Sequence, residues 1–160
     1  MRIAIIYSSH QGYALECAKH MASVFAAEGN QSDLFDVRKE ANKLVIDEYD
    51  TIILGGGIHA GHLSGSLRKF CSRHEAHLRT KRLGLFICST DKDNYEKQFV
   101  DNFPQSLLDA AVAKGWFGGR IVFAEQKGIM RLILKKILKG ERDVFEEHPE
   151  AVKAFMAEMA

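Results

Sequence analysis

Residues 7–21 read YSSHQGYALECAKHM, and this stretch decides how the chain begins to fold. The run at residues 3–7 is apolar throughout, which is typical of a strand covered on both faces of a sheet. After Gly12 the apolar residues recur with helical spacing, and Gly29 and Asn30 provide a stop signal. The stretch therefore predicts a buried strand that turns directly into a helix, with two serines and a glycine at the junction.

The same alternation continues along the chain. Residues 32–37 are predicted to form a second strand, and further strands are predicted at residues 50–54, 83–88 and 120–124. Helical spacing predicts helices at residues 12–25, 67–74, 95–99, 105–113, 130–138 and 149–159. Strands that alternate with helices require a parallel sheet with helices on both faces, which is a doubly wound α/β fold in three layers. Residues 1–160 are predicted to form one domain, because the five strands leave no room for a second.

Composition excludes several classes of protein. Of the 160 residues 46% are hydrophobic and 27% are charged, with a formal net charge of +1, so neither disorder nor a nucleic-acid partner is expected. Cys17, Cys71 and Cys88 show no CxxC spacing, which argues against a disulfide framework and a thiolate metal site and fits a reducing cytoplasm. The sequence contains no HExxH pattern, so no metal site is expected, and no apolar run approaches the roughly 20 residues that span a bilayer.

The end of the first strand has the composition of an anion site. Hydroxyl groups, free backbone N–H groups and a helix N-terminus converge there, and all three favour a phosphate. A simple N-cap by one of the two serines is the alternative interpretation. The loop matches neither GxxxxGK[ST] nor GxGxxG and contains no lysine, so a cofactor monoester held by hydroxyls and amides, without a cation, is expected. The predicted phosphate-binding residues are Ser8, Ser9, His10, Gln11, Gly12, Tyr13 and Ala14.

Two more strand ends carry unusual loops. In open α/β sheets ligands bind beyond the carboxyl ends of the strands, so these loops should meet the first one. The triple glycine at residues 55–57 allows close approach to a flat ring, and a polar loop follows the strand that ends near Cys88. A phosphate on one loop and a planar ring between two others is the arrangement that flavin mononucleotide (FMN) requires. The predicted ring-binding residues are Gly56, Gly57, Ile58, His59, Gly61, Cys88, Ser89, Thr90 and Asp91.

These three loops together resemble the flavodoxin family. Within it, the segments ILGGGIHAGHLSGSLRKFCSRH (residues 53–74) and IMRLILKKILKGERD (residues 129–143) are similar to the menaquinone-dependent protoporphyrinogen oxidase (protoporphyrinogen IX dehydrogenase) branch. The resemblance spans nearly the whole chain. It implies a five-stranded sheet of order 2-1-3-4-5, FMN as cofactor, and a porphyrinogen or a quinone as substrate.

The chain departs from the family pattern at two places. Ala14 stands where the phosphate loop of the family usually has threonine, so one phosphate hydroxyl is missing. An aromatic side chain often faces the flavin ring, and here the candidates are His59 and Tyr95.

The resemblance implies an FMN-dependent oxidoreductase in heme biosynthesis, in which the flavin performs the redox chemistry and His59 is the one candidate catalytic side chain. The alternative within the family is a flavodoxin-type electron carrier with no substrate of its own. Such carriers tend to be strongly acidic, whereas this chain has a pI of about 7.8. A flavin-free module on the same fold is a third interpretation, which the serine-glycine loop opposes.

The stretch from Met130 to Lys139 predicts a basic amphipathic helix. Such helices lie on anionic membranes, so peripheral contact with the inner face of the cell membrane is one expectation. The alternative is that its apolar stripe packs on the sheet as an ordinary covering helix. The last predicted helix, at residues 149–159, could supply that cover instead. On the basic helix, the apolar residues expected to share one face are Met130, Ile133, Leu134, Ile137 and Leu138.

Overall fold

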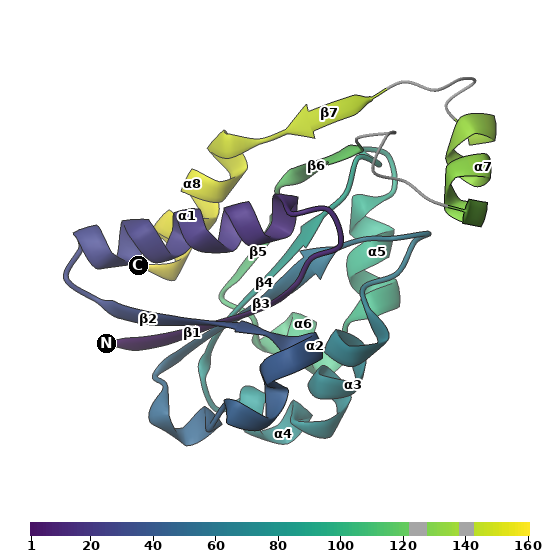
Figure 1. The fold of residues 1–160 in the computed structure, drawn as a ribbon. Helices are drawn as coiled ribbons and strands as arrows, with labels where there is room; N and C mark the ends of the chain where they lie inside the picture. Colours follow the sequence, from purple (N-terminus) through teal and green to yellow (C-terminus); the bar gives the residue numbers. More distant parts are fainter. Residues whose placement is uncertain (122–127, 138–142) are drawn as a thin grey trace.

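The computed structural model describes residues 1–121, 128–137 and 143–160. Its centre is a five-stranded parallel sheet with the order β2-β1-β3-β4-β5 (Figure 1). This is the order that the family resemblance implies. The first four predicted strands are confirmed, with ends that differ by at most three residues. The strands are β1 (Arg2–Ser8), β2 (Gln31–Asp36), β3 (Thr51–Gly57), β4 (Arg82–Cys88) and β5 (Ala113–Trp116).

Helices cover both faces of the sheet (Figure 1). One face carries α1 (Tyr13–Ala27) and α8 (Pro149–Met159). The opposite face carries α2 (Val37–Glu40), α3 (Gly65–Arg73), α4 (Glu75–Leu78), α5 (Tyr95–Asn102) and α6 (Gln105–Ala110), together with the 3-10 turns Ala41–Lys43 and Ile46–Glu48. The three-layer prediction is confirmed.

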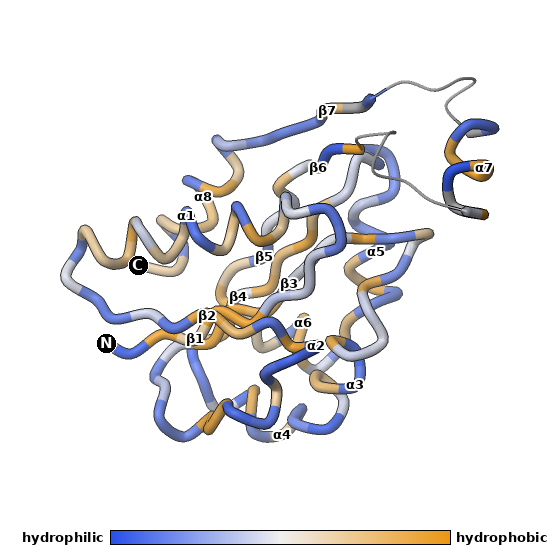
Figure 2. The backbone as a smooth tube through the Cα atoms, viewed as in Figure 1, coloured by the Kyte–Doolittle hydropathy of each residue, from blue (hydrophilic) through white to orange (hydrophobic). Residues whose placement is uncertain are grey.

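The hydrophobic core consists of two layers, one on each side of the sheet. Ile3 and Ile5 pack with the layer under α1 and α8, whereas Ala4 and Ile6 pack with the opposite layer. Successive side chains of a strand point to opposite faces, so a strand covered on both sides must be apolar at every position. Figure 2 shows this as hydrophobic strands in the middle of the molecule.

The prediction for the fifth strand was wrong. Residues 113–116 form β5 beside β4, and α6 ends at Ala110 instead of continuing to residue 113. Residues 113–116 read AKGW, which is too short and too broken by Lys114 and Gly115 to show a strand pattern. Of the predicted strand at residues 120–124, Arg120 and Ile121 belong to β6 (Gly118–Ile121), and residues 122–124 lie outside the described part of the chain.

A small second sheet lies beside the main one. In it β6 pairs antiparallel with β7 (Val144–Glu147). Helix α7 (Gly128–Ile137) stands at the edge of the molecule, beyond α5 (Figure 1). The sheet is covered by α8, which buries Phe155 and Met159, whereas Ile129 and Leu132 of α7 are 76% and 67% exposed. The described part of α7 is therefore not a covering helix of the sheet.

Candidate functional site

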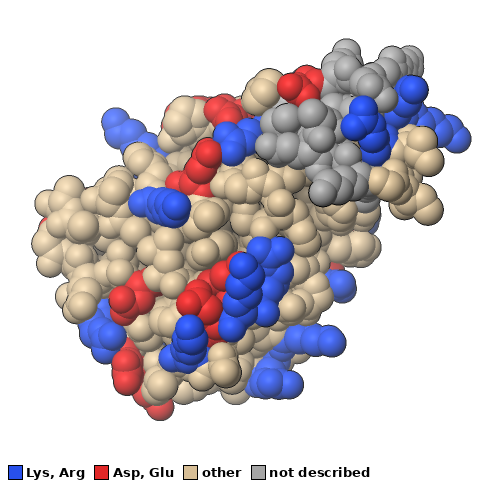
Figure 3. All heavy atoms as spheres, in the orientation of Figure 1, with Lys and Arg blue, Asp and Glu red and all other residues tan. Residues whose placement is uncertain are grey.

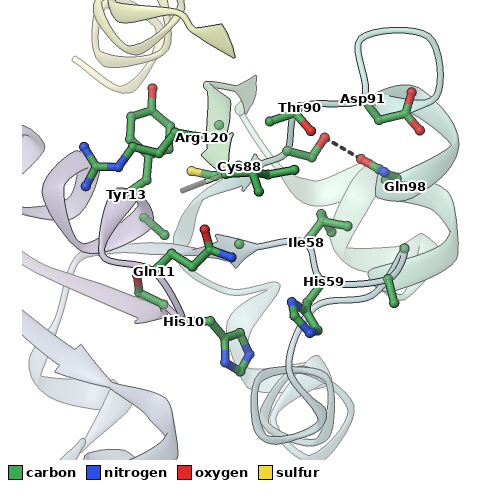
Figure 4. Close-up of a pocket in the computed structure, with 18 of the residues that line it drawn as sticks. His10, Gln11, Tyr13, Ile58, His59, Cys88, Thr90, Asp91, Gln98 and Arg120 are labelled. Carbon is green, nitrogen blue, oxygen red and sulfur yellow. Dashed lines mark hydrogen bonds between the residues drawn. The ribbon is translucent and has the colours of Figure 1, made fainter. Parts of the chain in front are cut away.

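A cavity of about 280 Å³ opens at the carboxyl ends of β1, β3 and β4 (Figure 4). The loops that follow these three strands form most of its wall, as expected for an open parallel sheet. The structure brings together thirteen of the sixteen predicted cofactor-binding residues there: Ser9, His10, Gln11, Tyr13, Ala14, Gly57, Ile58, His59, Gly61, Cys88, Ser89, Thr90 and Asp91.

The phosphate loop turns into α1 at Gly12. Gly12 has φ of 86°, in the left-handed region that glycine adopts at little cost. The hydroxyl of Ser9 accepts a hydrogen bond from the Gly12 N–H at 3.0 Å, within the loop. Among the described residues no side chain caps α1, so the N-cap interpretation of the serines was wrong. The first N–H groups of this helix, at Tyr13 and Ala14 of the cavity wall, therefore have no side-chain acceptor among the described residues, as a bound anion requires.

Three predicted residues do not line the cavity: Ser8, Gly12 and Gly56. Ser8 is completely buried, and its hydroxyl lies against Gly56, where an added Cβ would come within 2.5 Å of the Ser8 Oγ. In a strand, neighbouring side chains point to opposite sides, so Ser8 and Ser9 cannot both face the same pocket. Gly56 therefore makes room for Ser8, beneath the cavity.

Buried polar atoms test whether FMN fits this cavity. The Oε1 atom of Gln11, a cavity residue, is buried and has no hydrogen-bond partner within the described residues. A ribityl chain carries hydroxyl groups that donate to such an oxygen. The uncapped α1 N-terminus lies on the same side, and the apolar side chain of Ile58 forms another wall (Figure 4). The donors, the acceptor and the apolar wall match the phosphate, ribityl chain and ring of FMN.

The wall opposite the phosphate loop is held by hydrogen bonds that the loops after β3 and β4 make with neighbouring elements. The Ile58 N–H donates to the Cys88 carbonyl at 2.8 Å, which joins the loops after β3 and β4. Ser89 donates its hydroxyl to Gln98 at 2.8 Å, and its carbonyl accepts from Trp116 Nε1 at 2.8 Å. These bonds give the ring-binding side of the cavity a rigid backbone.

Two histidines face each other at the cavity. The His10 and His59 rings lie 5.3 Å apart between centroids, and Figure 4 shows both below Gln11 and Ile58. Burial, followed by the charge of Arg38 and by His59, lowers the pKa of His10. His10 is therefore a neutral base near pH 7. Tyr95, the other aromatic candidate for the ring, stacks instead on Trp116 at 4.5 Å and is absent from the cavity wall, so that expectation was wrong.

The cavity thiol belongs to a buried pair. Burial, followed by a hydrogen bond with Cys17, raises the pKa of Cys88. The hydrogen bond with Cys88 lowers the pKa of Cys17, although burial opposes it. Cys88 therefore remains protonated and contributes a small apolar surface to the cavity.

Arg38, which sequence reasoning missed, supports the phosphate loop from α2. Its guanidinium donates to the Ser9 carbonyl at 2.7 Å and to both carboxylate oxygens of Asp36 at 3.1 and 3.2 Å. Asp36 also caps α2 by accepting from the Arg38 N–H at 3.0 Å. Burial acts against the charged form of Asp36, but the hydrogen bonds from Arg38 outweigh it and lower the pKa of Asp36.

Replacing Asp36 with alanine is expected to lower the free energy of unfolding at pH 7 by about 1–3 kcal/mol, because both the cap and the ion pair are lost. The folded-state pKa of Asp36 lies below its ordinary value. This contribution is therefore present above about pH 4 and disappears as the pH falls through the lower folded-state pKa. Urea denaturation at pH 7 and pH 3 measures it. The exposed Asp93→Ala variant is the control, and a difference between Asp36→Ala and wild type that does not shrink in acid would contradict the assignment.

Of the cavity residues in the described part of the chain, six were not predicted from the sequence: Ala60, Gln98, Gly119, Arg120, Ile121 and Leu134. Gln98 reaches the site from α5 through its bond with Ser89. Arg120 contradicts the expectation of a phosphate loop without a cation nearby, because β6 carries it to the N-terminus of α1, where it pairs with Glu16 at 2.7 Å. Sequence reasoning missed Arg120 because it assigned this residue to a strand of the main sheet at residues 120–124. No local signal in the sequence places β6 over the cavity.

Known proteins resemble this chain along most of its length. The family model described as Flavodoxin domain matches residues 4–147. Protoporphyrinogen IX dehydrogenase (quinone) of Escherichia coli K12 is 26% identical, and the match covers 92% of this chain and 86% of that protein.

Solved structures agree with the fold. The flavodoxin of Streptococcus pneumoniae TIGR4 has a TM-score of 0.61 and 18% identity, and the match covers 99% of this chain and 97% of that one. Flavodoxin 1 of Bacillus cereus has a TM-score of 0.55 and 22% identity over the same shares of the two chains.

The match over residues 4–147 confirms the predictions of a flavodoxin fold, of FMN as the cofactor and of oxidation–reduction as the class of chemistry. The electron-carrier alternative is less favoured, because the curated relatives are named as dehydrogenases. This chain belongs to the flavodoxin domain family and is an FMN-dependent oxidoreductase.

Proposed function

We propose that this oxidoreductase removes electrons from a porphyrinogen and passes them to a quinone. The similarity to protoporphyrinogen IX dehydrogenase (quinone), over 92% of this chain, is the observation that carries the proposal. The cavity supports it, since the loops after β3 and β4 and the segment β6 contribute the apolar side chains of Ile58 and Ile121 and several small residues to its lining. The near-neutral pI of about 7.8 also favours an enzyme over an acidic electron carrier.

Each part of the cavity has a role in this proposal. Bound FMN supplies the two-electron chemistry. The backbone of residues 9–14 binds the phosphate, and Ile58 forms a wall for the ring. Oxidation of a porphyrinogen releases protons, and the imidazole of His10, whose pKa is lowered chiefly by burial, accepts a proton at the cavity beside the His59 ring, whose centroid lies 5.3 Å away.

An anaerobic assay tests the proposed reaction. Purified protein with FMN should form a yellow complex with a dissociation constant in the micromolar range or lower. It should then oxidise protoporphyrinogen IX when a menaquinone analogue is added. A protein that binds FMN but exchanges electrons only with ferredoxin-type proteins and reductases would be an electron carrier, and the substrate proposal would fall.

Membrane contact through α7 is a second part of the proposal. Among the described residues no helix has the length and apolar character to cross a bilayer. Helix α7 nevertheless exposes Ile129, Leu132 and Ile133 next to Lys135 and Lys136. Figure 3 shows blue Lys or Arg side chains and tan surface together at this edge of the molecule. An amphipathic helix of this kind binds anionic lipid through apolar burial and charge.

The exposed apolar face differs in part from the predicted one. Ile133 is exposed as expected, but Leu134 is half-buried and lines the cavity. The side chains of Met130 and Ile137, and all of Leu138 and Lys139, lie outside the described residues. Leu134 belongs both to α7 and to the cavity wall, and this supports a route for an apolar quinone between a membrane surface and the cavity.

Flotation with vesicles containing an anionic lipid tests this contact. The double variant Lys135→Glu, Lys136→Glu is expected to bind at least about tenfold more weakly, since each basic residue near a charged surface contributes about 1 kcal/mol. The double variant Lys19→Glu, Lys153→Glu, on exposed positions of α1 and α8, has the same charge change and should still float. Failure of the wild type to float at low salt removes the membrane proposal.

A further inference from the structure

Strand β6 brings one arginine to the phosphate end of the cavity. Arg120 lines the cavity, and an added Cβ on Gly12 would lie 3.8 Å from its Nη2 atom (Figure 4). Gly12 is the residue from which α1 begins, so the guanidinium lies next to the N–H groups that the anion site uses. A positive charge and a helix N-terminus at one place both favour a phosphate.

The position of Arg120 is determined by several contacts. Its Nη1 and Nη2 atoms donate to the two carboxylate oxygens of Glu16 at 3.0 and 2.7 Å. Its guanidinium carbon lies 5.6 Å from the centre of the Tyr13 ring. The Tyr13 hydroxyl in turn donates to the Phe117 carbonyl at 2.7 Å, one residue before β6 begins. The first turn of α1 therefore holds β6, and with it the guanidinium, over the phosphate loop.

Glu16 and Glu147 are the described carboxylates near Arg120, and both are more hydrated than Arg120 itself. The side chain of Arg120 is 22% exposed, whereas that of Glu16 is 58% exposed. Glu147, whose Oε1 atom lies 3.7 Å from Arg120 Nη1, has a side chain that is 43% exposed. Water screens exposed charges more strongly than half-buried ones. A guanidinium has donors directed along several edges and can serve a carboxylate and a phosphate together. The charge of Arg120 is therefore less screened by water than the charges of these two carboxylates.

We propose that Arg120 binds the phosphate of FMN and makes the site selective for FMN over riboflavin, with Glu16 as its positioning residue. This inference rests on the FMN site described above. It also accounts for Ala14: the hydroxyl that the loop lacks at this position is replaced by a cation from β6, far along the sequence. Riboflavin has the same ring and ribityl chain without the phosphate, so Arg120 contributes to binding one flavin and not the other.

Quenching of flavin fluorescence measures both affinities. Arg120→Gln is expected to weaken FMN binding by about 10- to 100-fold, the size of one charge-assisted hydrogen bond, with riboflavin binding unchanged. Arg120→Lys should retain part of the preference. FMN affinity of the wild type should fall with added salt more steeply than that of Arg120→Gln. Arg79→Gln, an exposed position at the end of α4, has the same charge change and should leave both affinities as they are.

The outcomes separate this inference from the function on which it rests. An unchanged ratio of FMN to riboflavin affinity in Arg120→Gln overturns the inference alone. Equal losses for both flavins overturn it too, because they show that Arg120 only holds β6 in place. A wild-type protein that binds neither flavin overturns the FMN site and this inference with it.

Discussion

Replacing Gly55 with alanine is expected to lower the free energy of unfolding by about 3 kcal/mol or more. Gly55 lies in the middle of the sheet, opposite Tyr7 of β1 and Phe86 of β4. An added Cβ would lie 2.2 Å from the Phe86 carbonyl oxygen and 2.3 Å from its ring. A backbone oxygen within a paired strand cannot move without breaking the ladder, so β3 and β4 must separate.

Urea denaturation of the variant and of Gly57→Ala measures this effect. Gly57 ends the same strand, and a Cβ there would meet nothing within 4 Å. The Gly57 variant should therefore keep nearly the wild-type midpoint. Equal midpoints for Gly55→Ala and wild type would show that the sheet tolerates the methyl group and would contradict the packing described here.

The Phe117→Ala variant is expected to lose about 3–5 kcal/mol of stability, the usual cost of removing a buried aromatic ring. Phe117 is completely buried, with its ring 5.2 Å from that of Phe86 and 5.4 Å from that of Phe155. It stands between β5 and β6, where its carbonyl accepts from Tyr13 and from the His148 N–H. A cavity at this position should loosen β6, so flavin affinity should fall together with stability.

Thermal and urea unfolding measure the loss of stability. Titration of the folded variant with FMN measures the loss of flavin affinity. Phe145→Ala is a matched control, since Phe145 is 60% exposed on β7 and should change stability by no more than about 0.5 kcal/mol. If Phe117→Ala unfolds at the wild-type midpoint, the link between the core and β6 is absent.

The sequence by itself determined the parts of this protein that depend on short stretches of chain. Apolar runs identified the central strands β1, β3 and β4, because a strand covered on both faces must be apolar at nearly every position. Their polar ends identified the three loops of the cavity, because parallel strands bring their carboxyl ends to one edge.

The tertiary structure decided what depends on partners far along the chain. In the folded protein the Ser8 side chain packs against Gly56, and the Tyr95 ring stacks on Trp116 instead of lining the cavity. In the folded protein β5, and not the predicted fifth strand, pairs with β4. Strand β6 therefore lies outside the main sheet, where its Arg120 contacts Glu16, 104 residues earlier in the chain. An edge strand of four residues has too few side chains to show a period, and its place is set by pairing with β4. The sequence of the phosphate loop carries no sign of a charge that another strand supplies. Only the packed structure could therefore place Arg120 at the phosphate end of the cavity.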